Sequence, residues 1–164
     1  MAVFNNYVDA NILLDRPTSA IAAQGSKLHA GRVVFDTVAA DDAGSIYRVL
    51  KAIPSSAVFQ RLNIWTDGVT GMNDVNVSLY KVGVGSAEVG TEVLGSAIDL
   101  SSAVLPTAAK DGMINITNTN RAKSLWQLAS ETLVDRQFAY DIALVSVADL
   151  SEADTIVVDF AYWA

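Results

Sequence analysis

Apolar and polar residues alternate along most of the chain from Arg32 onward. Successive side chains of a β-strand point to opposite faces of a sheet, so an alternation of period two predicts strands with one buried face. In residues 155–163, for example, Ile156, Val158, Phe160 and Tyr162 share the face opposite Asp159. We therefore predict strands at residues 32–38, 46–53, 57–65, 75–82, 141–148 and 155–163.

Short turn-forming sequences lie between several of these strands. They are residues 41–44 (DDAG), 54–56 (PSS), 67–71 (DGVTG) and 83–86 (GVGS). Parallel strands would need crossovers of a dozen or more residues, so these short connections favour antiparallel pairing. The pattern predicts an all-β protein, an antiparallel β-sandwich of about eight strands.

One segment has a helical pattern instead. Asn120 can cap the sequence RAKSLWQLA, in which Leu125 and Leu128 lie three positions apart. We therefore predict one short helix within residues 120–130, packed on the sandwich.

The first 31 residues follow neither pattern. Their short apolar fragments are interrupted by polar residues, by Pro17 and by two glycines. Apolar segments without a period of their own often become ordered on a partner. We predict an N-terminal arm at residues 1–31 that docks on a neighbouring subunit, followed by a single β-sandwich domain at residues 32–164.

Charged residues are few and unevenly placed. They make up 18% of the chain, against roughly 25% in an average soluble protein. The 18 acidic and 11 basic side chains give a net charge of −7, and no Lys or Arg follows Arg136. An acidic surface of this kind repels phosphate, so we expect no direct binding to nucleic acid.

Composition excludes several other classes. Hydrophobic residues make up 51% of the chain, enough for a sizeable core, and the absence of cysteine excludes disulfides, thiolate metal sites and a thiol nucleophile. No apolar run approaches the roughly 20 residues that cross a bilayer, and the N-terminal sequence lacks the regions of a secretory signal. We expect a protein made in the cytoplasm, with no membrane partner.

The residues that could support catalysis or metal binding have simpler interpretations. His29 is the only histidine and lies in a turn-like stretch (LHAGR), so we interpret it as a surface or interface residue. Gly83 and Gly85 follow a strand but lack the rest of a phosphate-binding motif, which indicates a loop. We therefore expect no catalytic residue and no cofactor, and we predict that the protein is not an enzyme.

Two acidic loops remain as alternatives. Residues 67–74 place two carboxylates in a tight loop that could hold calcium, but without EF-hand spacing, so a plain strand connection is favoured. Asp149, Glu152 and Asp154 could serve glycoside hydrolysis, although a solvated loop is the simpler interpretation.

The candidate interface residues are apolar or aromatic. Those in the arm have no regular spacing, and the tryptophans could fill a subunit interface or form a sugar-stacking platform. The candidates are Val3, Phe4, Tyr7, Ile12, Leu13, Leu14, Trp65, Trp126 and Trp163.

Several stretches resemble a known group of viral proteins. These stretches are residues 48–57 (RVLKAIPSSA), 62–67 (LNIWTD), 74–80 (DVNVSLY), 98–101 (IDLS) and 140–144 (YDIAL). Together they resemble small jelly-roll proteins encoded beside the major capsid genes of tailed bacteriophages. Those proteins act as head decoration, cement or fibre-base proteins, and the resemblance extends over roughly residues 32–163.

The resemblance implies a jelly-roll sandwich, a homotrimer in many members, and a structural role in the virion. The implied partners are the major capsid protein and further copies of the chain, with the protein bridging capsomers on the outer capsid surface. It implies no catalytic residue. The competing hypothesis is a carbohydrate-binding β-sandwich, either a lectin or a phage fibre tip, and an enzyme ranks third.

Overall fold

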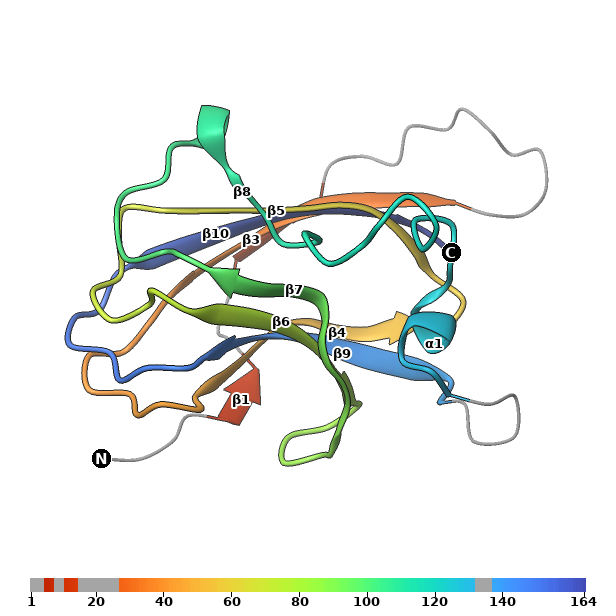
Figure 1. Cartoon of the computed structure of the whole chain (residues 1–164), viewed down its shortest axis with the longest axis horizontal. Helices are drawn as coiled ribbons and strands as arrows, with labels where there is room; N and C mark the ends of the chain where they lie inside the picture. Colours follow the sequence, from red (N-terminus) through yellow and green to blue (C-terminus); the bar gives the residue numbers. More distant parts are fainter. Residues whose placement is uncertain (1–4, 8–10, 15–26, 132–136) are drawn as a thin grey trace.

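Two β-sheets form the body of the protein (Figure 1). The computed structural model describes residues 5–7, 11–14, 27–131 and 137–164. One sheet contains, in order, β1 (Asn5–Tyr7), β4 (Ile46–Pro54), β9 (Ala139–Ser146), β6 (Val75–Lys81) and β7 (Glu88–Ile98). The other contains, in order, β2 (Asn11–Leu14), β3 (Leu28–Asp36), β10 (Thr155–Trp163), β5 (Val58–Thr66) and β8 (Lys110–Asp111).

The eight strands from β3 to β10 form a jelly roll. β3, β10, β5 and β8 make one sheet, and β4, β9, β6 and β7 make the other. Counted from β3 as the first strand, these orders are 1-8-3-6 and 2-7-4-5. Every pairing among these eight strands is antiparallel. This strand order produces the two Greek keys of a jelly roll. The predicted antiparallel, all-β sandwich is confirmed.

Apolar side chains from the two inner sheet faces fill the core. Val158 of β10, Leu62 of β5, Leu79 of β6 and Ile142 of β9 are fully buried. Alternate residues along these strands supply most of the core, as period two predicts. The inward face of β10 also includes Phe160 and is the one predicted from the sequence.

The helices are short. A single 3-10 turn, η1 (Pro106–Ala108), precedes β8, and α1 (Leu125–Leu128) lies at the turn between β4 and β5. The helix begins later than predicted, because Ser124, and not Asn120, precedes its first turn and donates its backbone N–H to Gln127 Oε1 at 2.9 Å. Among the described residues, no helix is long and apolar enough to cross a membrane.

Four strands are absent from the sequence prediction: β1 and β2 in the N-terminal segment, and β7 and β8 within the jelly roll. β7 contains Gly90, Gly95 and Glu92, which interrupt the alternation, and its register with β6 shifts repeatedly. β8 is only two residues long. In addition, β3 begins at Leu28, so His29 lies in a strand and not in the turn that the sequence suggested.

Part of the N-terminal segment extends both sheets. β1 pairs with β4 in parallel, whereas β2 pairs with β3 in the antiparallel sense. Tyr7 therefore lies in β1, and Ile12, Leu13 and Leu14 lie in β2. Val3 and Phe4 fall outside the described residues.

Candidate interaction surface

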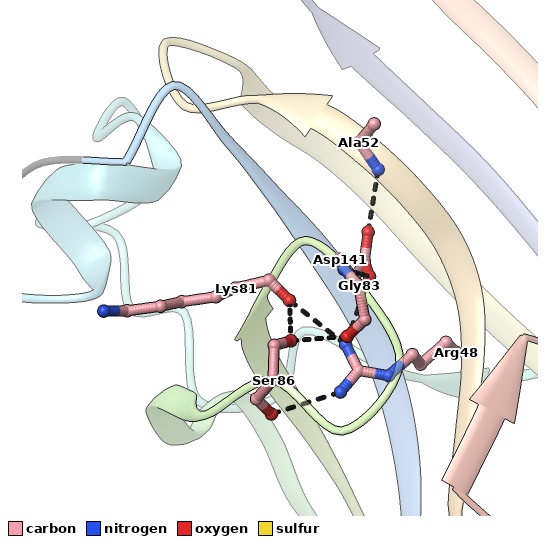
Figure 2. Close-up of polar contacts among 6 residues, drawn as sticks. All are labelled: Arg48, Ala52, Lys81, Gly83, Ser86 and Asp141. Atoms are coloured by element: carbon pink, nitrogen blue, oxygen red, sulfur yellow. Dashed lines mark hydrogen bonds and ion pairs between the residues drawn. The ribbon is translucent and has the colours of Figure 1, made fainter.

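A buried ion pair lies on the outer face of the sheet that contains β4 and β9. Arg48 and Asp141 are polar positions between inward-facing apolar residues, yet both side chains are fully buried. Arg48 Nη1 lies 3.1 Å from Asp141 Oδ2 (Figure 2). Burying two charges is costly unless further hydrogen bonds satisfy them, so the surroundings of this pair are informative.

Asp141, on β9, makes hydrogen bonds with two positions of β4 and with the turn between β6 and β7. Besides the Arg48 guanidinium, its carboxylate accepts hydrogen bonds from the backbone N–H of Ala52 at 2.9 Å and of Gly83 at 3.2 Å. Ala52 lies at an irregularity in β4 and has a φ of 53°, a left-handed conformation that costs a non-glycine residue energy. The carboxylate therefore stabilises a bulge in β4 and the start of the β6–β7 turn together.

Arg48 holds the other part of the β6–β7 turn (residues 82–87). Its guanidinium donates to the carbonyls of Lys81 at 3.2 Å and Ser86 at 3.3 Å, and it lies 4.7 Å from the centre of the Tyr80 ring. The Ser86 hydroxyl closes the turn by donating to the carbonyls of Lys81 and Gly83. The glycine-containing stretch is thus a strand connection, as predicted. Hydrogen bonds with the side chains of Arg48 and Asp141 hold it against the sheet (Figure 2).

This anchored turn displays apolar side chains to solvent. In the turn, Val82 is 47% and Val84 is 54% exposed, and in the segment that precedes β9, Phe138 is 95% exposed. Phe138 comes two residues before Tyr140, which pairs with Lys81, so the register brings Phe138 to the same end of the sheet as the turn. We call Val82, Val84 and Phe138 the apolar end patch.

The opposite end of the sandwich is acidic. The connections after β3, β5, β7 and β9 meet there, on the left of Figure 1, and contain no Lys or Arg. Backbone hydrogen bonds join them, for example from Val69 N–H to the Leu100 carbonyl at 2.9 Å. The eight carboxylate residues of this acidic end are Asp41, Asp42, Asp67, Asp74, Asp99, Asp149, Glu152 and Asp154.

Several of these carboxylates accept hydrogen bonds within the loops. Asp149 accepts from the backbone N–H of Ala43 at 2.7 Å, and Glu152 accepts from the hydroxyl of Thr70 at 2.9 Å. Asp41 is mostly buried and accepts from the Tyr47 hydroxyl at 2.6 Å. Among the described residues, no group of three or more His, Cys, Asp or Glu side chains has a geometry suited to a metal ion.

The predicted loop at residues 67–74 connects β5 to β6. Two of its own apolar side chains, Val69 and Met72, are completely buried. Leu100 donates its backbone N–H to the Met72 carbonyl at 2.7 Å, so the loop is fixed to the connection after β7. Its conformation is therefore explained by packing and by backbone hydrogen bonds.

The three tryptophans lie on three different elements. Trp65 is half-buried on the outer face of β5 beneath the guanidinium of Arg32, 4.8 Å from the ring centre. Trp163 lies six residues along β10 from the residue opposite Trp65, about 20 Å away at the usual strand rise. Trp126 lies on α1 and packs against the core. Trp65 and Trp163 are therefore too far apart to stack on one sugar ring.

His29 packs against an aromatic residue. Its ring stacks on Tyr162 with a centroid distance of 5.0 Å, and the residue is exposed at the start of β3. This contact accounts for the position of the side chain at the end of the sheet.

The ring of Tyr80, which packs against the Arg48 guanidinium, is expected to make the stability of the folded protein fall at high pH. Burial, followed by the charge of Glu88, raises the pKa of Tyr80 from 10.0 to about 12, while Arg48 acts in the opposite direction. Because the folded protein retains this proton more strongly than the unfolded chain, stability should fall as pH rises from 10 through 12. Urea unfolding at several pH values would measure this fall.

A tyrosine-to-phenylalanine variant isolates the contribution of this residue. Tyr80→Phe should make the loss of stability between pH 10 and 12 shallower, because the variant has no phenol to ionise. An identical slope in both proteins would contradict the assignment.

Comparison with known protein families, with curated proteins and with solved structures found no match to this chain.

Proposed function

We propose that this protein is a structural assembly module that docks on a large protein surface through its apolar end patch. More specifically, the proposal is that it is a head decoration protein of a tailed bacteriophage, bound to the outer capsid surface as a homotrimer and bridging capsomers. The observation that carries the proposal is the apolar end patch, in which Val82 and Val84 lie on a turn anchored by a buried ion pair.

An anchored apolar turn suits binding to another protein. Exposed large apolar side chains grouped at one place are typical of interaction sites. Binding to a preformed turn costs less conformational entropy than ordering a free loop. The contacts of Arg48 and Asp141 provide this preorganisation.

The charge distribution supports a particular orientation. The acidic end lies at the opposite ends of β6 and β9 from the apolar end patch. With the patch against the shell, the acidic end points outward, where repulsion between like charges keeps particles apart and repels nucleic acid. In this orientation the protein contacts the major capsid protein and not the packaged DNA.

Repetition on a symmetric shell would strengthen modest contacts. A standard protein interface buries roughly 1,600 Å². A trimer at a local three-fold axis presents the same contact three times, so binding gains from multivalency without any new type of contact.

Co-sedimentation with particles that lack the protein tests this proposal. Wild-type protein should sediment with such particles, and Phe138→Ser combined with Val84→Ser should reduce bound protein about tenfold or more, equivalent to about 1.4 kcal/mol. Leu105→Ser is the matched control, because Leu105 is exposed and apolar but lies outside the patch.

Two outcomes would contradict the proposal. Equal particle binding by the patch variant and the wild type would exclude the patch as the docking surface. If instead the protein fails to bind particles and is retained on a glycan column in a manner abolished by Trp65→Ala, a lectin function should replace this proposal.

A further inference from the structure

One short stretch of the chain covers two sheet edges. β3 and β4 are the outermost strands of the two jelly-roll sheets on the same side of the sandwich. The free edge of such a strand presents unpaired backbone groups that can pair with another strand. β1 occupies the β4 edge and β2 occupies the β3 edge, so these two strands together act as a clip across both sheets.

The clip has a pairing pattern that a simple hairpin cannot produce. The pair of β1 with β4 is the only parallel pair among the strands that the structure describes. β2 pairs through Asn11 with Val34 and through Leu14 with Gly31. Strand addition of this kind relies on backbone hydrogen bonds to a preformed edge, and any copy of the sandwich offers the same edge.

The connection to the body is long enough to reach another molecule. Thirteen residues lie between Leu14 and Leu28, and an extended chain of that length spans up to about 43 Å. A compact domain of this size has a radius of gyration of about 15 Å. The clip can therefore reach the β3 and β4 edges of a copy packed beside its own body.

We infer that residues 5–14 exchange between copies, so that the clip of one chain completes the sheet edges of the next. The exchanged and unexchanged forms contain the same strand pairs, so the exchange costs little beyond the entropy of association. Three chains that exchange in sequence close into a ring. This inference rests on the proposed assembly function, for which it supplies the means by which copies join.

Engineered cysteines can distinguish exchange from pairing within one chain. The natural chain has no cysteine, and Asn11 lies directly opposite Val34 in the β2–β3 register. Residues directly opposite in antiparallel strands have Cα atoms about 4.5–5.5 Å apart, a distance that a disulfide can bridge. Full-length Asn11→Cys and full-length Val34→Cys are mixed, refolded together from urea and oxidised gently.

Exchange predicts a disulfide-linked dimer of twice the 17.4 kDa chain mass on a non-reducing gel. A mixture of Asn11→Cys with Ser102→Cys is the control, because Ser102 is exposed but pairs with no part of β2; it should give no such dimer. A second opposed pair, Leu13→Cys with Arg32→Cys, repeats the test if either first variant fails to fold by circular dichroism.

The double variant Asn11→Cys/Val34→Cys supplies the opposing result. If it forms only a disulfide within one chain, while the mixed single variants form none between chains, exchange is overturned. The absence of any disulfide in either experiment would contradict the β2–β3 register and overturn the inference as well. Neither result involves particles, so the proposed capsid binding would still stand or fall by its own test.

Discussion

Replacement of Asp141 by alanine should destabilise the protein by about 3–5 kcal/mol, because it removes one partner of a buried ion pair. The substitution deprives the Arg48 guanidinium of this carboxylate. It also removes the acceptor for the backbone N–H groups of Ala52 and Gly83. Urea unfolding followed by tryptophan fluorescence would measure the loss as a fall in the transition midpoint.

An exposed ion pair in the other sheet provides the control. Arg32 and Asp159 make two hydrogen bonds, of 2.7 and 3.1 Å, but their side chains are 44% and 20% exposed. Asp159→Ala should therefore cost no more than about 1 kcal/mol. If Asp141→Ala and Asp159→Ala cause equal losses, the buried pair has no special role in stability.

Removing both charges should be less harmful than removing one. Arg48→Met combined with Asp141→Asn leaves no unbalanced charge and retains a side-chain oxygen that can accept from a backbone N–H. We expect this double variant to be more stable than Asp141→Ala. A double variant that is less stable than the single one would show that packing around Arg48, and not its charge, dominates.

The second large effect is expected at Gly71, in the connection between β5 and β6. Its φ is +101°, and a Cβ atom there would lie 2.2 Å from the backbone oxygen of Asp149. Gly71→Ala must therefore push apart two loops of the acidic end, including the hydrogen bond from Ser151 N–H to the Thr70 carbonyl. The expected cost is about 1–2 kcal/mol for the left-handed backbone and a further ~1–3 kcal/mol for the displacement.

Gly44 separates these two contributions. It has a similar φ of +85° and lies at the same end of the molecule, but no atom lies within 4 Å of a Cβ built on it. Gly44→Ala should therefore show only the backbone cost, and thermal unfolding of the two variants would measure the difference. Equal melting temperatures would mean that the loops around Gly71 move to admit the Cβ atom at no measurable cost in stability.

The sequence predicted most strands because alternation reflects the geometry of a strand with one buried face. In β10 the buried residues Ile156 and Val158 alternate with partly buried positions, and the structure buries the predicted face. β7 could not be found in this way. Glu92 and Ala97 adopt left-handed backbone conformations there, and each break shifts the side chains relative to the two faces.

The buried ion pair could not be predicted because its members are 93 positions apart. In the sequence, Asp141 occupies a position that alternation assigns to a solvent-facing sheet surface. In the fold, the β6–β7 turn and Arg48 meet at that surface and contact the buried carboxylate. One local signal was present: Ala143, two residues further along β9, is small and apolar at a position facing the same side, and it too is buried.

The apolar end patch likewise depends on three-dimensional placement. Val82 and Val84 lie beside glycines in a recognisable turn, whereas Phe138 comes from a segment more than 50 positions away. A sequence pattern shows that these residues are apolar, but it cannot show that the fold leaves them exposed.

The most direct test of the proposed function measures the stability of the phage head. Particles prepared without this protein should release their DNA at a lower temperature, or under a milder osmotic shock, than particles to which purified protein has been added back. Addition of the Phe138→Ser/Val84→Ser variant should not restore stability, because the variant lacks the apolar end patch. Release at the same temperature with and without wild-type protein, at concentrations that saturate the particles, would contradict a role in bracing the shell.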